Sequence, residues 1–343
     1  MRGAGHSVRY RGAGYIGRFA LREGVRFCAL MVAVSMVTFA LVAASPIDPV
    51  QANVGQQALL GMSAAKRAQL AEHWGASTPL PERYLMWARG VLAGDWGMSL
   101  RYNAPVAQVV GERLGNSIAL LACAWMLGGV IGTALGVVAG THRDEPVDRC
   151  IHGACIALSS TPAFWLGIVA LMVFSVALGW FPLGFSIPIG ASAGDVTLLD
   201  CLHHMVLPAL TLSVSGLSGV ALHTREKVID VMESDYVRFA RARGESARDV
   251  LVRHGLRNLV MPALTLQLAS IGEVFGGSVL VEQVFSYPGL GQAAVTAGLG
   301  GDAPLLVGIA LGSAALVFAG NALANVLYAL IDPRMREGRA HGA

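Results

Sequence analysis

YVRFARARGESARDVLVRHGLRNLVMP, residues 236–262, leads from an apolar run at 204–224 into a second apolar run that begins at 259. Runs of about 20 apolar residues are long enough to cross the hydrocarbon core of a bilayer, so this basic stretch is expected to connect two membrane spans. The stretch reads as a helix up to Arg243. Gly244 can adopt the positive φ that ends a helix, and Ser246 can cap the next one. The pattern predicts a helix–turn–helix elbow.

The second arm of the elbow is amphipathic. Val250, Leu251 and His254 fall on one helical face, and Pro262 marks the entry to the following span. A short amphipathic helix that projects from a membrane bundle can enter a cleft of a soluble partner as a rigid body. The simpler interpretation is a solvated basic loop.

Composition agrees with a chain that lies mostly in lipid. Of the 343 residues, 54% are hydrophobic and 14% charged, and the mean hydropathy is +0.57. We expect an all-α membrane protein with about six transmembrane helices, because apolar runs of sufficient length recur about six times. They lie near 27–45, 116–140, 151–181, 204–224, 259–281 and 304–331.

The basic residues predict the orientation. Of the 25 Lys and Arg residues, six precede the first run, two lie in 141–150, eight in 225–257 and three after residue 333. The connections 182–203 and 282–303 contain none. Because cytoplasmic loops are enriched in Lys and Arg, both termini and the elbow are expected in the cytoplasm.

These assignments divide the chain into five parts. The first run is interpreted as a retained helix in preference to a cleaved signal peptide, because it is long and follows a basic tail. The parts are a cytoplasmic tail (1–26), the first transmembrane helix (27–45), an extracytoplasmic segment with short helices (46–115), a five-helix core that includes the basic loop 225–258 (116–331), and a cytoplasmic tail (332–343).

Several motifs resemble one family of transport proteins. In the elbow, Ala240, Gly244, His254 and Pro262 are similar to the EAA signature of binding-protein-dependent ABC importer permeases. Further motifs look like the dipeptide, oligopeptide and nickel branch of that family: Pro79-Leu-Pro-Glu-Arg-Tyr84, Gly94-Asp-Trp-Gly-Met-Ser99, Ser160-Thr-Pro-Ala-Phe-Trp165, Gly179-Trp-Phe-Pro182, Leu207-Pro-Ala-Leu210, Val281-Glu-Gln-Val-Phe285, Tyr287-Pro-Gly-Leu-Gly291 and Asp332-Pro-Arg334. Gly115-Asn116-Ser117 stands where this family commonly has Pro-x-Thr.

The resemblance implies a type I ABC importer permease fold with a cytoplasmic coupling helix, in a bacterial inner membrane. It also implies the partners: a second homologous permease, two ATP-binding subunits that grip the coupling loops, and an extracytoplasmic solute-binding protein. ATP and Mg²⁺ would be used by the partner subunits, and this chain is expected to bind no cofactor and no nucleic acid. The residues expected to take part in ATPase coupling are Ala240, Arg243, Gly244, Glu245, Ser246, Val250, Leu251, His254 and Pro262.

No phosphate-binding loop is visible in the sequence. Such a loop needs Gly directly before its Lys, and the two lysines, Lys66 and Lys227, follow Ala65 and Glu226. No Ser/His or Asp/Asp pair suggests a catalytic site within the spans. The chain is therefore not expected to be an enzyme.

One acidic residue falls within an apolar run. Glu273 lies among glycines and serines, and a carboxylate at that depth must face water or a partner. We predict that it lines the translocation pathway with Gly276, Gly277 and Ser278. A packing carboxylate, paired to a neighbouring helix or to the second permease, is the alternative.

The connection 282–303 has turn chemistry and is predicted to face outward. The resemblance places Tyr287, Pro288, Gly289, Gly291 and Asp302 at an outer gate or at the docking surface for the binding protein. A tight turn that only fixes register is the other interpretation. Cys201, His203 and His204 form a cluster with too few ligands to predict a metal site.

The expected function is a pore subunit that imports di- or oligopeptides. The same machinery could carry nickel or a metal chelate, because the binding protein holds most of the specificity. A secondary transporter or channel without an ATPase partner is the alternative of another class, although no inverted repeat or paired broken helices stand out.

Overall fold

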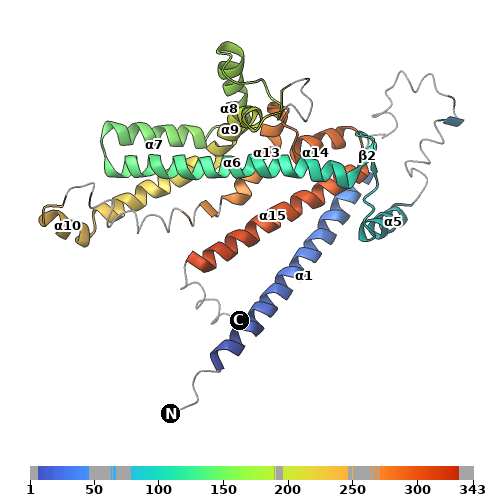
Figure 1. Ribbon diagram of the computed structural model, residues 1–343, viewed down its shortest axis with the longest axis horizontal. Helices are drawn as coiled ribbons and strands as arrows, with labels where there is room; N and C mark the ends of the chain where they lie inside the picture. Colours follow the sequence, from blue (N-terminus) through green and yellow to red (C-terminus); the bar gives the residue numbers. More distant parts are fainter. Residues whose placement is uncertain are drawn as a thin grey trace. The chain divides into compact units, whose positions relative to one another are not determined.

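Long helices make up most of the described chain (Figure 1). The computed structural model describes residues 7–45, 63, 65–66, 79–188, 190, 196–245, 249, 264, 267–268 and 270–331. For 7–20, 236, 241, 271–273 and 328–331 it describes the backbone alone. The helices and strands are α1 (Ser7–Ala44), α5 (Leu80–Leu92), β1 (Met98–Ser99), β2 (Ala104–Pro105), α6 (Val106–Thr141), α7 (Pro146–Ser159), α8 (Ala163–Ala170), the π-helix η1 (Leu171–Ala177), α9 (Leu198–Met232), α10 (Asp235–Ala242), α13 (Ile271–Val284), α14 (Leu290–Leu299) and α15 (Ala303–Ile331).

Four described helices are long and apolar enough to cross a membrane, namely α1 over Leu21–Ala44, α6, α9 and α15 over Ala303–Leu327. They account for the predicted runs 27–45, 116–140, 204–224 and 304–331. Helix α6 begins ten residues before the predicted start of the core, because Val106–Gly115 continue the same helix. The fifth predicted run is 259–281. Most residues of its first part, 259–270, lie outside the described residues, and α13 forms the remainder.

The third run, 151–181, does not form the single straight span that its hydropathy suggested. Helices α7 and α8–η1 meet at a bend of 106°. Pro162, the residue before α8, lacks an N–H to continue the first helix. The hydroxyl of Ser160 donates to Ile156 O at 2.9 Å and that of Thr161 to Ala157 O at 2.8 Å, so the helix end is closed by side chains. The pair is a broken span or a re-entrant segment.

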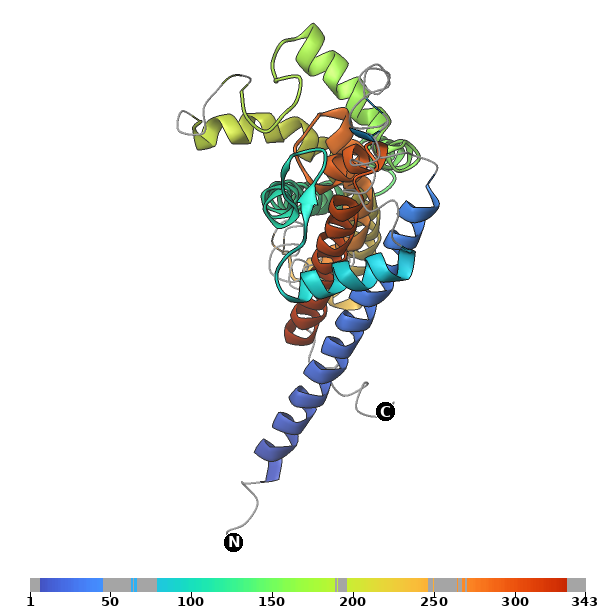
Figure 2. The ribbon, with the colours of Figure 1, turned by 90° about the vertical axis from the view of Figure 1, so that its right-hand side faces the viewer.

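The chain divides into two compact units, residues 1–111 with 294–318 and residues 112–293 with 319–343. In the first unit, α5 lies across α1 (Figure 2). The ring of Phe39 meets the edge of Tyr84 at a centroid distance of 5.5 Å, and the Tyr84 hydroxyl lies 2.9 Å from Ser35 Oγ. Val307 and Leu311 of α15 complete this core. Helix α5 is thus a short helix within the segment 46–115, as expected there, and it packs through its aromatic side chains.

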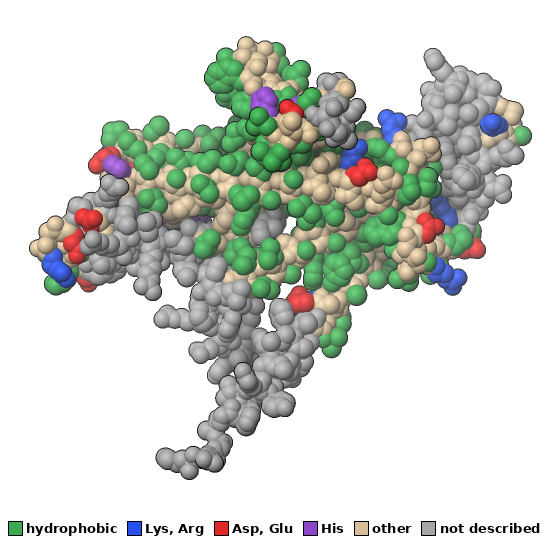
Figure 3. All heavy atoms as spheres, in the orientation of Figure 1, with side chains coloured by type: hydrophobic (Ala, Val, Ile, Leu, Met, Phe, Trp, Pro, Cys, Tyr) green, Lys and Arg blue, Asp and Glu red, His purple; other side chains and the backbone are tan. Residues whose placement is uncertain are grey.

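In the second unit, α9 is the central helix and packs against α7, α8 and α13. Its side chains Leu207, Ala209 and Leu212 share one buried core with residues of α6 and α13. Figure 3 shows hydrophobic side chains along the lengths of α6 and α7, with acidic and histidine side chains at the end where the two helices join. This pattern fits helices that meet lipid along their length.

Helices α6 and α9 approach each other closely along a row of glycines, Gly128, Gly132, Gly136 and Gly140. A Cβ on Gly132 would lie 2.8 Å from Leu217 O, and one on Gly136 would lie 2.5 Å from Ala221 O. Both distances are shorter than van der Waals contact, and the atoms met belong to backbone that cannot move aside. Small residues at a fixed spacing let membrane helices pack backbone to backbone. The glycine row therefore sets the distance between α6 and α9.

Adding one methyl group to this row should separate the two helices. We expect Gly136→Ala to destabilise the second unit by about 1–3 kcal/mol, because overpacking at a rigid contact cannot be relieved by a rotamer change. The midpoint of thermal unfolding in detergent measures the effect. Gly115→Ala is the matched control on the same helix, where a Cβ would have open space. Equal midpoints for the two variants would contradict the close packing.

Candidate functional site

The first arm of the predicted elbow is present as α10, attached to the end of α9. Val237 and Ala240 are buried and pack with Val231 of α9. The carbonyl of Ser234 accepts hydrogen bonds from Val237 N at 3.1 Å and Arg238 N at 3.0 Å. The Ser234 amide donates to Val231 O of α9 at 3.1 Å, so packing and the hydrogen bonds of the connecting turn attach α10 to the end of α9.

The elbow turns at Gly244, which has φ +85°, and the helix end predicted there is confirmed. The amide of Glu245 donates to Ala240 O at 3.2 Å, which closes the last turn of α10. Arg243 is exposed, and its guanidinium lies 6.0 Å from the centre of the Phe239 ring. Ser246, Val250, Leu251, His254 and Pro262 lie outside the described residues, so the second arm stays a prediction.

The predicted pathway residues lie on α13 and do not share one face. Gly277 contacts Leu212 and Ser215 of α9, and Ser278 is buried with its hydroxyl donating to Phe275 O at 2.9 Å. Gly276 is exposed and has open space around it. The backbone places Glu273 three residues before Gly276, on the same side of the helix. The placement of Glu273, Gly276, Gly277 and Ser278 along the translocation pathway stays a prediction.

A buried carboxylate that the sequence did not single out organises the α13–α14 connection. Glu282 is completely buried. Its Oε2 accepts from Gly291 N at 2.7 Å and Gln292 N at 3.1 Å, and its Oε1 accepts from the Ser117 hydroxyl at 2.8 Å. The Ser117 oxygen in turn accepts from Leu290 N at 2.8 Å. The carboxylate thus holds the N-terminal turn of α14 against α6, and its buried charge is matched by three donors.

The glycines of the connection make room for this carboxylate. A Cβ on Gly289 would lie 2.4 Å from the Glu282 carboxyl carbon, and one on Gly291 would lie 2.6 Å from the backbone of Val279. Directly before Gly289, the carbonyl of Pro288 accepts from Asn116 Nδ2 at 2.9 Å. Ser117 occupies the position where the family pattern has threonine, so the hydroxyl is kept.

Tyr287 is also buried in this connection, and its hydroxyl donates to the sulfur of Met205 at 3.8 Å. Burial raises the pKa of Tyr287 to about 12, so the phenol remains neutral. Tyr287, Pro288, Gly289 and Gly291 therefore form one packed turn in the second unit. Their part in an outer gate or in docking stays a prediction.

Asp302 belongs to the first unit, whereas the other residues of this predicted group belong to the second. It is completely buried and accepts from the Ser99 hydroxyl at 2.7 Å, Arg101 N at 3.0 Å and Leu305 N at 3.2 Å. It caps the start of α15 and holds the turn between β1 and β2. The Asp302 carboxylate is hydrogen-bonded within the chain. A binding protein that docked here would therefore contact the residues around Asp302 and not its carboxylate.

The two histidines of α9 bind backbone carbonyls. His203 Nε2 lies 3.0 Å from Trp180 O, and the buried His204 has Nδ1 2.7 Å from Gly184 O. A carbonyl only accepts, so each of these ring nitrogens carries a proton. Across the described residues, no group of three or more His, Cys, Asp or Glu side chains is placed to hold a metal ion.

The comparisons with known proteins agree with this architecture. Residues 132–337 match the family described as binding-protein-dependent transport system inner membrane component, and residues 16–120 match the N-terminal region of such membrane components. The chain belongs to this family. It is 33% identical to the oligopeptide transport system permease protein AppB of Bacillus subtilis, over 92% of this chain and 98% of that protein.

Other relatives also match nearly the whole length of this chain. The dipeptide transport system permease protein DppB of Escherichia coli is 30% identical over 93% of this chain and 98% of its own length. A putative peptide permease protein of Brucella suis is 32% identical over 93% of this chain and 99% of its own length. The family and the apolar helices together make this chain a multi-pass component of a bacterial inner membrane. The predicted resemblance is confirmed.

Sequence reasoning missed Glu282 because the residue reads as an ordinary polar position at the end of an apolar run. The available signal was an acidic residue followed by Tyr287-Pro-Gly-Leu-Gly291, a turn with two small residues that leave space for a side chain. Its principal partner, Ser117, lies 165 residues away in the chain. No local pattern connects the two.

We expect Glu282→Gln to loosen the α13–α14 connection. A glutamine amide supplies one acceptor oxygen for three donors and adds an NH₂ that has no acceptor there, which should destabilise the connection by about 1–3 kcal/mol. Hydrogen exchange of residues 285–293, followed by mass spectrometry, should become clearly faster. Gln283→Ala is the control, since that side chain makes a longer bond, 3.2 Å from Nε2 to Gln292 O, and is partly exposed. Unchanged exchange in Glu282→Gln would show that the carboxylate does not hold the turn.

Proposed function

We propose that this chain forms half of the translocation pathway of an ATP-driven importer of di- or oligopeptides. The observation that carries the proposal is the first arm of the elbow, where the short helix α10, followed by Gly244 with φ +85°, packs on the end of a long apolar helix, in a chain whose family works with a binding protein. Relatives that match almost the whole chain are named as oligopeptide and dipeptide permeases. These names support peptides as the solute class.

In this proposal the elbow lies in the cytoplasm. Eight of the 25 Lys and Arg residues fall in 225–257, and the connections 182–203 and 282–303 have none, which supports cytoplasmic termini and an outward-facing α13–α14 connection. Two ATP-binding subunits grip the elbows of this chain and of a second permease. An extracytoplasmic binding protein delivers solute from the other side.

The mechanism that fits is alternating access. ATP and Mg²⁺ bound by the partner subunits close the ATPase dimer, which displaces the elbows and opens the pathway outward. Hydrolysis returns the pathway to the inward-open state. This chain supplies no phosphate-binding loop, so its part is to move and to line the path.

Reconstitution tests the proposal directly. The isolated chain should show no ATP hydrolysis above background, and the complex with its second permease, ATP-binding subunits and binding protein should hydrolyse ATP. In liposomes, that complex should accumulate a labelled di- or oligopeptide only with ATP and Mg²⁺. If the complex accumulated a nickel chelate and no peptide, the solute class would be a metal chelate and not a peptide. Robust hydrolysis by the isolated chain, or uptake without ATP, would refute the mechanism.

Glu273 provides a test of the pathway. We propose that its carboxylate contacts a cationic group of the solute, such as a peptide amine. Glu273→Gln should then slow uptake of a peptide with a free amine by roughly tenfold at saturating binding protein, because a charge-assisted hydrogen bond contributes about 1.5–3 kcal/mol. Uptake of the N-acetylated peptide should not change. Glu226→Gln, which removes an exposed carboxylate from α9, is the control. Equal uptake of every solute by Glu273→Gln and the unchanged chain would rule the contact out.

A further inference from the structure

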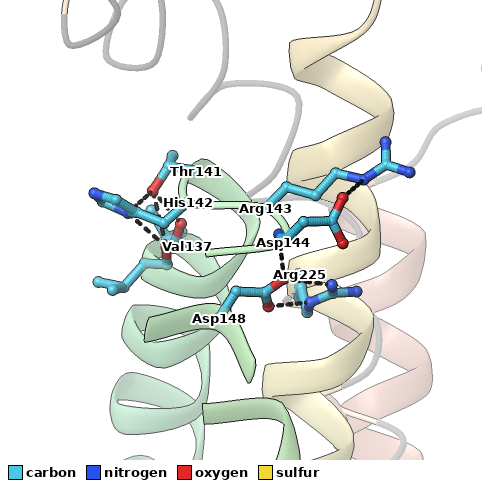
Figure 4. A network of polar contacts seen from close by, with 8 residues as sticks. Val137, Thr141, His142, Arg143, Asp144, Asp148 and Arg225 are labelled. Carbon is cyan, nitrogen blue, oxygen red and sulfur yellow. Dashed lines mark hydrogen bonds and ion pairs between the residues drawn. The ribbon is translucent and has the colours of Figure 1, made fainter. Parts of the chain in front are cut away.

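A network of charged groups joins the α6–α7 turn to the last turns of α9 (Figure 4). The turn is tight: Asp144 has φ +64°, and its amide donates to Asp148 Oδ2 at 2.9 Å. Arg143 forms an ion pair with Glu233 at the end of α9, and its Nε lies 3.4 Å from Asp144 Oδ2. Both side chains of the Arg143–Glu233 pair are about half exposed, so water screens this contact.

The second ion pair of the network, between Arg225 and Asp148, is largely buried. Arg225 of α9 donates from Nε to Asp148 Oδ1 at 2.5 Å and from Nη2 to Asp148 Oδ2 at 2.6 Å. The Asp148 side chain is 2% exposed and that of Arg225 is 20% exposed. Two parallel bonds between a planar guanidinium and a carboxylate fix distance and rotation together. The pair therefore locks the start of α7 to α9 in one orientation.

The helices on either side of this pair continue into the parts that must move. Toward the elbow, α9 continues into α10, which packs on it through Val231, Val237 and Ala240. In the other direction, α7 leads to the 106° bend and α8. Near the pair, α6 also touches α9, where a Cβ on Gly140 would lie 2.8 Å from Arg225 O.

We propose that Asp148 and Arg225 are positioning residues that pass displacement of the elbow from α9 to α7 and its bent continuation. The inference rests on the proposed function, since it assigns how the force applied at α10 is distributed within this chain. Without the pair, α9 moves and α7 follows only through apolar contacts and the solvent-screened Arg143–Glu233 pair at the α6–α7 turn. Apolar contacts are non-directional and slide more easily than a forked ion pair.

Stability alone does not account for a buried pair of this kind. The free energy needed to remove two charges from water offsets most of their attraction. Such pairs therefore contribute little net stability compared with apolar side chains of the same volume. What the pair provides is a defined geometry between two helices. A role in transmission and a role in folding therefore predict different outcomes when both charges are removed together.

The test uses the complete complex in liposomes and measures solute uptake per ATP hydrolysed. Asp148→Asn combined with Arg225→Gln removes both charges and keeps an oxygen that can accept from the Asp144 amide. The glutamine is too short to reproduce the fork. We expect uptake per ATP to fall about fivefold or more, with hydrolysis still present. Arg225→Lys, which keeps the charge and loses the fork, should show a smaller fall in the same ratio.

The matched control is on the same helix. Lys227 and Asp230 form an exposed pair, 2.9 Å from Nζ to Oδ2, within α9 alone. Lys227→Gln combined with Asp230→Asn removes the same charges and should leave uptake per ATP unchanged. Uptake and ATP hydrolysis are both normalised to the amount of assembled complex, so a loss of assembled protein does not change their ratio. The midpoint of thermal unfolding is recorded on the same samples.

An unchanged ratio in the Asp148→Asn, Arg225→Gln complex overturns the proposal, whatever its thermal midpoint. An equal fall in the Lys227→Gln, Asp230→Asn control also overturns it, since the effect would then come from charge and not from the link to α7. Failure of the proposed function is distinct from both results. It would show as an unsubstituted complex that takes up no solute with ATP.

Discussion

The close approach of α6 and α9 is the constraint on which the second unit depends. In lipid there is little hydrophobic gain from bringing two apolar helices together, so the contact must come from packing and polar interactions. The glycines at 128, 132, 136 and 140 let the backbone of α6 reach the carbonyl oxygens of α9. With this distance fixed, short side chains such as Ser117 and Asp148 can reach partners on neighbouring segments.

Buried carboxylates are used twice in that frame, and each has its donors in place. Glu282 holds the start of α14, and Asp148 holds the α6–α7 turn and Arg225. A carboxylate removed from water is tolerated only when hydrogen bonds replace those to water. Both therefore specify one arrangement of the chain more than they add to its stability. Asp302 has the same part in the first unit, at the start of α15.

The sequence predicted the features that depend on neighbouring residues. Apolar length located α9 and α15, because the thickness of a bilayer is a local requirement on each run. Gly244 marked the end of α10, because a positive φ is a property of one residue. The bend before Pro162 was missed since hydropathy is unbroken through 151–181, although Ser160 and Thr161 preceded the proline. The bond from Ser117 to Glu282 and the pairing of Arg225 with Asp148 were beyond reach, because these partners lie 165 and 77 residues apart.

Helix α9 connects these features as one long element. It has 35 residues, which corresponds to roughly 50 Å of helix. Near its start, His204 binds the carbonyl of Gly184, and near its end Arg225 binds Asp148 while Val231 packs on α10. A helix transmits displacement along its length only if the groups around it are attached at defined points. The polar attachments of α9 lie near its two ends, and between them its side chains Val220, Thr224 and Val228 pack over the glycines of α6. The directional contacts that orient α9 are thus at its ends, and close packing against α6 fills the length between them.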